Sequence, residues 1–156
     1  MEQYRTSKDA LTKCELKGSI LPQTEIDTDQ IISLLELSEG DQQAAEKLKI
    51  GLDRKSILWN NVYSLYYDAL HKIVDSYLRF DKITSLNHIC LFAYLCEKHP
   101  ELEIDWNFFE KIRTKRNGIN YYGQKASYND WNSIEIQARL YIKMIQEEVQ
   151  KKLQKD

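Results

Sequence analysis

The sequence contains little proline and little glycine, with two and five residues respectively among 156. This scarcity argues against a turn-rich β fold, a collagen-like chain and a disordered chain. No apolar run approaches the ~20 residues that a membrane-spanning helix needs. The opening residues, MEQYRTSKDA, lack the apolar stretch of a secretory signal. We therefore expect a cytoplasmic protein with no membrane partner.

An excess of positive charge is also missing, because the formal net charge is −2. The molecule as a whole is therefore not an electrostatic binder of nucleic acid, and any such role needs a local basic patch. Cysteine is sparse too, and no pair among Cys14, Cys90 and Cys96 has the C-x-x-C spacing of a zinc or redox site. We expect free thiols in a reducing cytoplasm, with Cys90 and Cys96 as small core residues.

Metal and phosphate-loop motifs are absent from the sequence. The three histidines lie in separate segments, and no H-E-x-x-H, glycine-rich phosphate loop or G-x-S-x-G motif occurs. His71 is expected to lie at the surface or with its hydrogen bonds satisfied. His88 is expected to serve in capping or packing. No metal and no cofactor are therefore predicted.

Helical periodicity dominates what is present. Apolar residues make up 42% of the chain and recur at steps of three and four, which indicates amphipathic helices. Gly40 is a potential break in the first long helix, and Gly51 is its natural end. Side chains that can cap helices precede four of the segments: Asp27 or Thr28, Asp53, Asp105, and Ser127 with Asp130. The expected long helices cover residues 28–50, 53–80, 86–99, 106–117 and 128–149.

Short connections between these helices predict an all-α, antiparallel up-and-down bundle. Four core helices are expected within a domain at residues 28–156. Residues 1–27 are expected to form an N-terminal extension with a short helix around Leu11 and Leu16, followed by a linker at 17–27. Gly118 and Gly123 are expected to bracket an irregular or frayed helix end.

One segment, FFEKIRTKRNGINYYGQKASY, combines basic and aromatic residues. Cations bind phosphates and aromatic faces stack on bases, so the mixture suits single-stranded RNA or a nucleotide. The alternative is that basic residues complement a helix dipole and the tyrosines pack with their hydroxyls outward. The segment contains Lys111, Arg113, Lys115, Arg116 and Lys125 within fifteen residues, interleaved with Tyr121, Tyr122 and Tyr128.

The stretch from Asp53 to Leu153 resembles the HEPN superfamily (higher eukaryotes and prokaryotes nucleotide-binding), whose members carry an R-x(4–6)-H motif in a helical bundle. KRNGINYYG supplies Arg116 and Asn117, and the pattern NNVYSLYYDALHKIVDSYL followed by SLNHICLFAYL is also similar to the family. The resemblance implies a homodimer that shares an Arg–His cleft and cleaves RNA without metal. Guanidinium holds the phosphate, and histidine moves a proton from the ribose 2′-OH.

The sequence departs from that motif at the histidine, because Tyr121 stands at the commonest spacing. An unperturbed tyrosine is only ~0.1% ionised at pH 7 and is a poor general base. We therefore predict a HEPN-like dimer that binds RNA or nucleotide near Arg116 and Asn117, with weak or no ribonuclease activity. Any remaining catalysis would use Arg116, Asn117 and Tyr121. The predicted binding residues are Arg113, Lys115, Arg116, Tyr122 and Lys125.

Two alternatives stay open. The first is a metal-independent, toxin-like endoribonuclease that uses Tyr121 with Arg116. The second is the helical partner of a minimal nucleotidyltransferase in a toxin–antitoxin pair. In some such pairs the transferase modifies a tyrosine whose position corresponds here to Gly123, with Tyr121 and Tyr122 close by.

Overall fold

The computed structural model describes residues 3–155, which form an all-α bundle with one very small sheet. The predicted fold class is therefore confirmed. The sheet pairs β1 (Leu21–Pro22) with β2 (Ile83–Thr84), and two short 3₁₀ helices, η1 (Arg79–Asp81) and η2 (Pro100–Leu102), complete the structure. The helices are α1 (Ser7–Leu16), α2 (Thr28–Lys49), α3 (Trp59–Leu78), α4 (His88–Lys98), α5 (Trp106–Tyr122) and α6 (Tyr128–Gln154).

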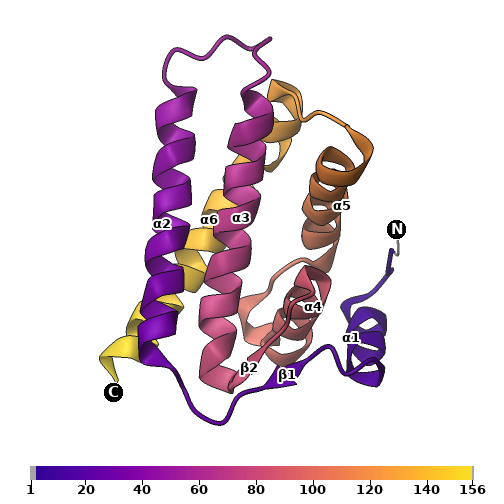
Figure 1. Cartoon of the computed structure of the whole chain (residues 1–156), viewed down its shortest axis with the longest axis vertical. Coiled ribbons are helices and arrows are strands. Elements are labelled where there is room, and N and C mark those ends of the chain that lie inside the picture. The colour runs from indigo at the N-terminus through magenta and orange to yellow at the C-terminus, as the bar shows by residue number, and fades with distance from the viewer. Residues whose placement is uncertain (1–2, 156) are drawn as a thin grey trace.

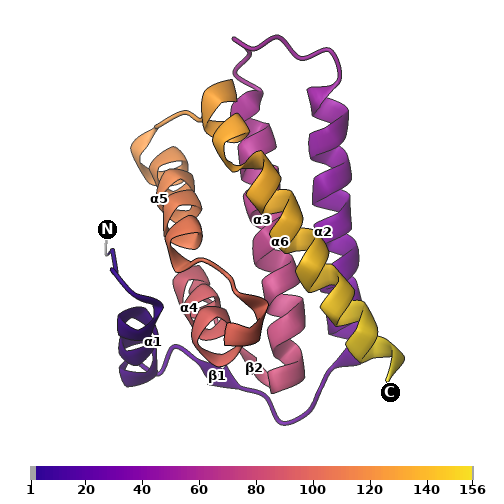
Figure 2. The same cartoon turned by 180° about the vertical axis from the view of Figure 1, so that it is seen from behind.

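Helix α3 lies at the centre of the molecule and contacts α2, α4, α5 and α6. In Figure 1, α2 runs beside α3 and α6 passes behind them, while α4 and α5 lie on the other side of α3. Figure 2 shows α6 crossing α3 and α2 from the back. Because α3 packs against helices on several sides, its apolar stripe is wide, and Tyr63, Leu70 and Val74 are all buried.

Three of the predicted caps are confirmed. The Gln30 N–H donates to Asp27 Oδ1 at 3.0 Å, and Asp105 accepts from the second residue of α5. Ser127 and Asp130 form a full capping box at the start of α6. Each cap supplies an acceptor to backbone N–H groups that a helix start leaves without a partner.

Asp53 behaves differently from the prediction, and the structure answers the question that the sequence left open at Gly40. Asp53 accepts from the Lys55 N–H at 2.7 Å within a turn, and α3 begins only at Trp59. Helix α2 runs unbroken through Gly40, because packing against α3 outweighs the low helix propensity of one glycine. Helix α2 ends at Lys49, and Gly51 follows with a φ of 65°, the left-handed conformation that glycine adopts without cost.

The glycines of the basic segment also differ from the prediction. Helix α5 continues without interruption through Gly118, which is buried inside it, and ends at Tyr122. Gly123 follows with a φ of 65°, and the Gln124 N–H donates to the Gly118 carbonyl at 3.0 Å. The segment is therefore regular helix to its end, so the side chains of residues 113–121 are placed by helical geometry.

The N-terminal extension contains the expected short helix, α1, with Leu11 buried and Leu16 exposed. Two residues of the expected linker at 17–27 instead form β1, which pairs with β2 in antiparallel register. In Figure 1, α1 lies at the outer edge of the molecule, beyond α4. Helix α4 is the helix against which α1 mainly packs.

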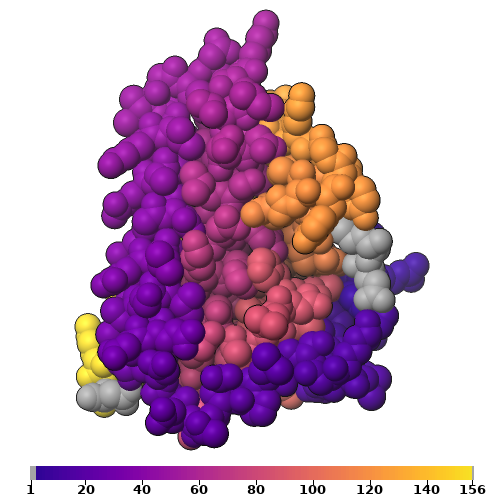
Figure 3. Space-filling view, viewed as in Figure 1, coloured from indigo at the N-terminus to yellow at the C-terminus, as the bar shows by residue number. Residues whose placement is uncertain are grey.

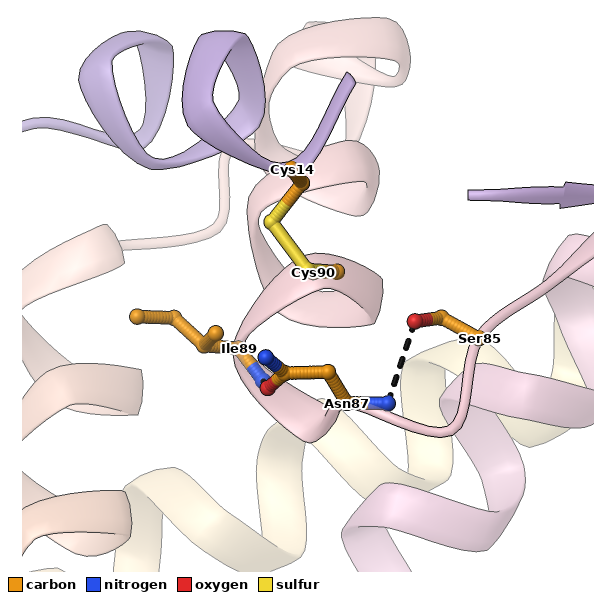
Figure 4. The surroundings of a disulfide bond; sticks show 5 residues. All are labelled: Cys14, Ser85, Asn87, Ile89 and Cys90. Carbon is orange, nitrogen blue, oxygen red and sulfur yellow. Dashed lines mark hydrogen bonds between the residues drawn. A yellow bond between two sulfur atoms is a disulfide. The ribbon is translucent and has the colours of Figure 1, made fainter. Parts of the chain in front are cut away.

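A disulfide joins α1 to α4, so the prediction of free thiols is wrong for two of the three cysteines. Cys14 and Cys90 are bonded at an S–S distance of 2.09 Å, and Figure 4 shows the bond between the two helices. Cys90 is fully buried, as predicted, whereas Cys96 is a half-buried free thiol. The bonded pair is 76 residues apart and has no local motif, so spacing could not reveal it.

Candidate functional site

A hollow of about 640 Å³, here called the Arg116 pocket, lies where α3, the start of α4, the end of α5 and the segment before β1 meet. Figure 3 shows this face, with the indigo N-terminal segment, the pink start of α4 and the orange end of α5 side by side. Helix α3 contributes Tyr67 and the start of α4 contributes His88. The α5 residues that line it are Arg113, Arg116, Asn117, Asn120 and Tyr121.

Helical spacing explains why these five α5 residues share one hollow. Steps of three and four residues return a side chain to the same face of a helix. The structure therefore brings together all three residues predicted for catalysis, namely Arg116, Asn117 and Tyr121. It also adds Arg113 from the predicted binding set.

The Arg116 guanidinium is only partly paired. Its Nη2 lies 3.4 Å from Asp68 Oδ1, a long contact, and the guanidinium carbon lies 5.8 Å from the centre of the Tyr67 ring. Its Nε and Nη1 are buried and have no hydrogen-bond partner within residues 3–155. A buried charged donor without an acceptor costs free energy. Arg116 lines the pocket, so a small turn of its side chain would let an anion in the pocket supply that acceptor.

Arg113 lines the same pocket, but its charge, unlike that of Arg116, is fully paired with a neighbouring carboxylate. Its Nε donates to Glu110 Oε1 at 2.8 Å and its Nη2 to Glu110 Oε2 at 3.2 Å. This bidentate ion pair balances the positive charge of Arg113 locally. Arg113 therefore shapes the pocket, and Arg116 is the stronger candidate to receive an external anion.

Two histidines stack on each other beside the Arg116 pocket, one of them, His88, lines it, and their pairing was missed by sequence reasoning. The rings of His71 and His88 stack with centroids 3.6 Å apart, and the Tyr67 hydroxyl lies 3.0 Å from His88 Nδ1. His71 Nε2 is buried without a partner within the described chain, so the prediction of a surface or satisfied histidine is wrong. His88 packs at the start of α4, as predicted, but Asn87 is the cap, and His88 also lines the pocket.

Burial sets the protonation of this group. Burial lowers the pKa of His71 to about 3, and the nearby charges of His88 and Lys72 lower it further. Burial also lowers the pKa of His88, with Arg116 adding to the effect and Asp68 opposing it. Both rings are therefore neutral at pH 7. Burial raises the pKa of Tyr67, so its hydroxyl stays protonated.

Tyr121 lies at the edge of the pocket and is largely exposed, at 76% of its full surface. Leu86, from the turn before α4, lies on the same edge and is 92% exposed. An exposed aromatic ring beside an anion site is the arrangement in which a base can stack while its phosphate is held.

The remaining predicted binding residues lie elsewhere. Lys115 projects from the other side of α5 into a second hollow of about 670 Å³, where it pairs with Asp130 at 3.3 Å. Tyr122 is exposed, and neither it nor Lys125 lines either hollow. The structure therefore divides the basic segment between two faces of α5, a division that composition alone does not show.

Metal-ligand clusters and membrane-spanning helices are both absent from residues 3–155. No three side chains among His, Cys, Asp and Glu come together as metal ligands would. No helix in this range has both the length and the apolar character required to cross a bilayer.

The chain matches no protein-family model, no curated protein and no solved structure at a significant level.

Proposed function

We propose that this chain is a HEPN-like helical protein that binds RNA or a nucleotide in the Arg116 pocket, with weak or no ribonuclease activity. The observation that carries the proposal is the pair of buried, unpartnered donors on Arg116, Nε and Nη1, at the wall of a hollow. Guanidinium is permanently charged and presents its donors in a planar fork that matches phosphate oxygens.

The rest of the pocket suits the other parts of a nucleotide. Tyr121 offers an exposed ring on which a base can stack. The side-chain amides of Asn117 and Asn120 carry both donors and acceptors, which suit ribose hydroxyls or base edges. The volume of about 640 Å³ is within the range of sites for small organic ligands.

A matched pair of neighbouring residues tests this proposal. Arg116→Ala removes the unpartnered donors, whereas Lys115→Ala removes a charge that is paired with Asp130 at the other hollow. Fluorescence polarisation of a labelled eight-nucleotide single-stranded RNA, and calorimetry with adenosine 5′-monophosphate, measure the affinity. A hydrogen bond to a charged group contributes roughly 1.5–3 kcal/mol, so Arg116→Ala should weaken binding by about 10- to 100-fold.

Lys115→Ala should change the affinity by less than about twofold, because screened surface pairs contribute little. Circular dichroism checks that both variants remain helical. Absence of binding to either probe, or an equal loss in the two variants, contradicts the proposal.

A second candidate function is metal-independent RNA cleavage in the same pocket. The observation that favours it is His88, which lines the pocket beside Arg116 and is neutral at pH 7 because burial lowers its pKa. A neutral imidazole can accept a proton from a ribose 2′-OH, which the phenol of Tyr121 does poorly. His88 thus offers an imidazole, which the KRNGINYYG segment itself lacks.

Cleavage is measured with RNA in EDTA, with products ending in 2′,3′-cyclic phosphate expected. His88→Gln should lower the rate about 100-fold or more, the usual contribution of a general base. Tyr121→Phe keeps the ring and removes only the hydroxyl, so it isolates any role of the phenol. Cleavage that persists unchanged in both variants contradicts this second function.

The partners are proposed from the resemblance. A homodimer is proposed, and the exposed side chain of Leu86 at the edge of the pocket supports a partner surface there, since large apolar groups favour burial. Light scattering after gel filtration tests it, and a strict monomer at high concentration contradicts it. A nucleotidyltransferase partner would act on the exposed Tyr121 or Tyr122, which mass spectrometry after incubation with such an enzyme and ATP would detect.

A further inference from the structure

We propose that thiol–disulfide exchange at Cys14–Cys90 opens and closes the Arg116 pocket, so that the oxidised chain binds its ligand and the reduced chain binds it weakly. The inference rests on the proposed function for the identity of the ligand. The opening of the pocket itself is measured without any ligand.

The disulfide connects the two chain segments that form one side of the pocket. Cys90 lies in the first turn of α4, directly after Ile89, and Cys14 lies in the last turn of α1, just before Gly18. Gly18, Ser19 and Leu21 line the pocket from one segment, and residues 85–89 line it from the other. Figure 4 shows the bond above the turn at which the Asn87 N–H donates to Ser85 Oγ at 3.1 Å.

The buried part of α1 is small. Its buried residues are Ala10, Leu11 and Cys14, and α4 is the one helix of the described chain with which it makes an extended contact. Contacts outside this patch add to it: the Trp106 indole N–H donates to the Tyr4 carbonyl at 3.0 Å, the Tyr4 N–H donates to Glu110 Oε2 at 3.3 Å, and Ser7 donates to Glu97. A helix of ten residues is marginal by itself in water, so α1 belongs to the least stable part of the fold.

The other end of the wall is fixed independently of the disulfide. Leu21 and Pro22 pair with β2, and the Gln23 N–H donates to the Lys82 carbonyl at 2.7 Å. Between this pairing and Cys14 lie only residues 15–20, where Gly18 has a φ of 65°. In the oxidised form, residues 15–20 are held at one end by the disulfide and at the other by the β1–β2 pairing. Reduction therefore releases the Cys14 end. The wall of the pocket formed by Gly18 and Ser19 then moves away from His88.

The exchange needs a dithiol reductant, because two electrons and two protons must be supplied. One thiolate of the reductant attacks a sulfur of the Cys14–Cys90 bond, the S–S bond breaks, and a mixed disulfide forms. The second thiol of the reductant displaces the remaining protein sulfur. The products are the thiols of Cys14 and Cys90 and the disulfide of the reductant. Because both sulfurs are covered, reduction proceeds through transient opening of α1.

The experiment compares the full chain before and after reduction with dithiothreitol. The first measurement is the NMR titration of the His88 ring, whose pKa is lowered by burial. An open wall admits water, so this pKa should rise towards its ordinary value after reduction. The second measurement is the affinity for the eight-nucleotide RNA. It should fall about tenfold, as expected if α1 remains docked in about one reduced molecule in ten.

Two variants complete the design. The double variant Cys14→Ala/Cys90→Ala should behave as the reduced chain in both reductant conditions. Cys96→Ala, which removes the one free thiol, should keep the full response to dithiothreitol. If the double variant fails to fold, reduction of the natural chain alone still decides the outcome.

The two measurements separate the possible failures. An unchanged His88 titration together with an unchanged RNA affinity overturns the inference and leaves the proposed function standing. A shifted His88 titration with no RNA binding in either form shows that the pocket opens but that the proposed ligand is wrong, and regulation of RNA binding then falls as well.

Discussion

The imidazole rings of His71 on α3 and His88 on α4 stack with their centroids 3.6 Å apart and their planes inclined by 24°. The contact joins the central helix to the helix that forms one wall of the Arg116 pocket. Burial lowers the pKa of both rings, so the contact is made by two neutral imidazoles. Protonation would place a charge within an interface that has no acceptor for His71 Nε2 among residues 3–155.

This pair predicts that the free energy of unfolding falls in mild acid. The pKa of His71 is about 3 in the folded chain and about 6.5 in the unfolded chain. The unfolded chain therefore takes up a proton first, and stability declines as the pH falls from about 6.5 towards 3. Between pH 7.5 and 5.0 we expect His71 alone to remove about 2 kcal/mol, measured by urea unfolding at both pH values.

The variant His71→Phe separates titration from packing. Phenylalanine can occupy the same space beside His88 and Phe92 but cannot take up a proton. We expect the decline in stability between the two pH values to shrink by about 2 kcal/mol in this variant. An acid response as steep as that of the natural chain would show that His71 is not its source.

Neighbouring tyrosines at the end of α5 predict a difference in ligand affinity. Tyr121 lines the Arg116 pocket, whereas Tyr122 does not, although both rings are exposed. Stacking of a base on an aromatic ring contributes about 1–3 kcal/mol. Tyr121→Ala should therefore weaken binding of the eight-nucleotide RNA by roughly 5- to 100-fold. Tyr122→Ala should leave the affinity within about twofold, and the reverse order would assign the stacking surface to the other face of the helix.

Two glycines predict opposite effects of the same substitution. Gly40 lies on the exposed side of α2, where an added Cβ meets nothing within 4 Å. Gly40→Ala should raise the free energy of unfolding by about 0.5–1 kcal/mol, because alanine loses less backbone entropy in a helix. Gly51 has equal space but a φ of 65°, so Gly51→Ala should lower it by about 1–2 kcal/mol. Thermal unfolding of both variants measures the contrast.

A buried hydroxyl predicts the cost of disturbing the contact between α2 and α3. Ser38 is fully buried and donates to the Ala69 carbonyl at 2.7 Å. Ser38→Ala should lower the free energy of unfolding by about 1 kcal/mol, and Ser38→Leu by a further 1–3 kcal/mol through overpacking. Ser33 lies exposed on the same helix, so Ser33→Ala serves as the control. Alanine has the higher helix propensity, so Ser33→Ala should cause no loss, and equal losses at the two positions would contradict a role for the buried contact.

The periodic apolar residues and the short polar caps were sufficient to predict the class of fold and most of the helices. Asp27, Asp105 and Ser127 marked helix starts, because these signals are local. Asp53 shows the limit of such signals, since a capping side chain also suits a turn.

Only residues that α5 contributes to the site were predicted from the sequence. The family motif named Arg116, Asn117 and Tyr121, but the helix that carries Tyr121 into the same pocket was not predicted, because the segment from Gly118 was expected to be irregular or frayed. Tyr67 and His88 come from other helices, and the contact between Asp68 and Arg116 spans 48 residues. Nothing in the local pattern encodes these pairings, which depend on how α3, α4 and α5 pack. The one available signal was that His88 opens a strongly apolar helix.

Because α5 separates two hollows, a complete alanine scan of this helix would produce two interleaved series of defects. Residues 113, 116, 117, 120 and 121 border one hollow, and residues 107, 110, 111, 114 and 115 border the other. Any activity that resides in a single hollow would respond to one series and ignore the other, with a repeat close to 3.6 positions. The spacing of the sensitive positions would thus identify the face of α5 that carries the activity, even before a ligand is known.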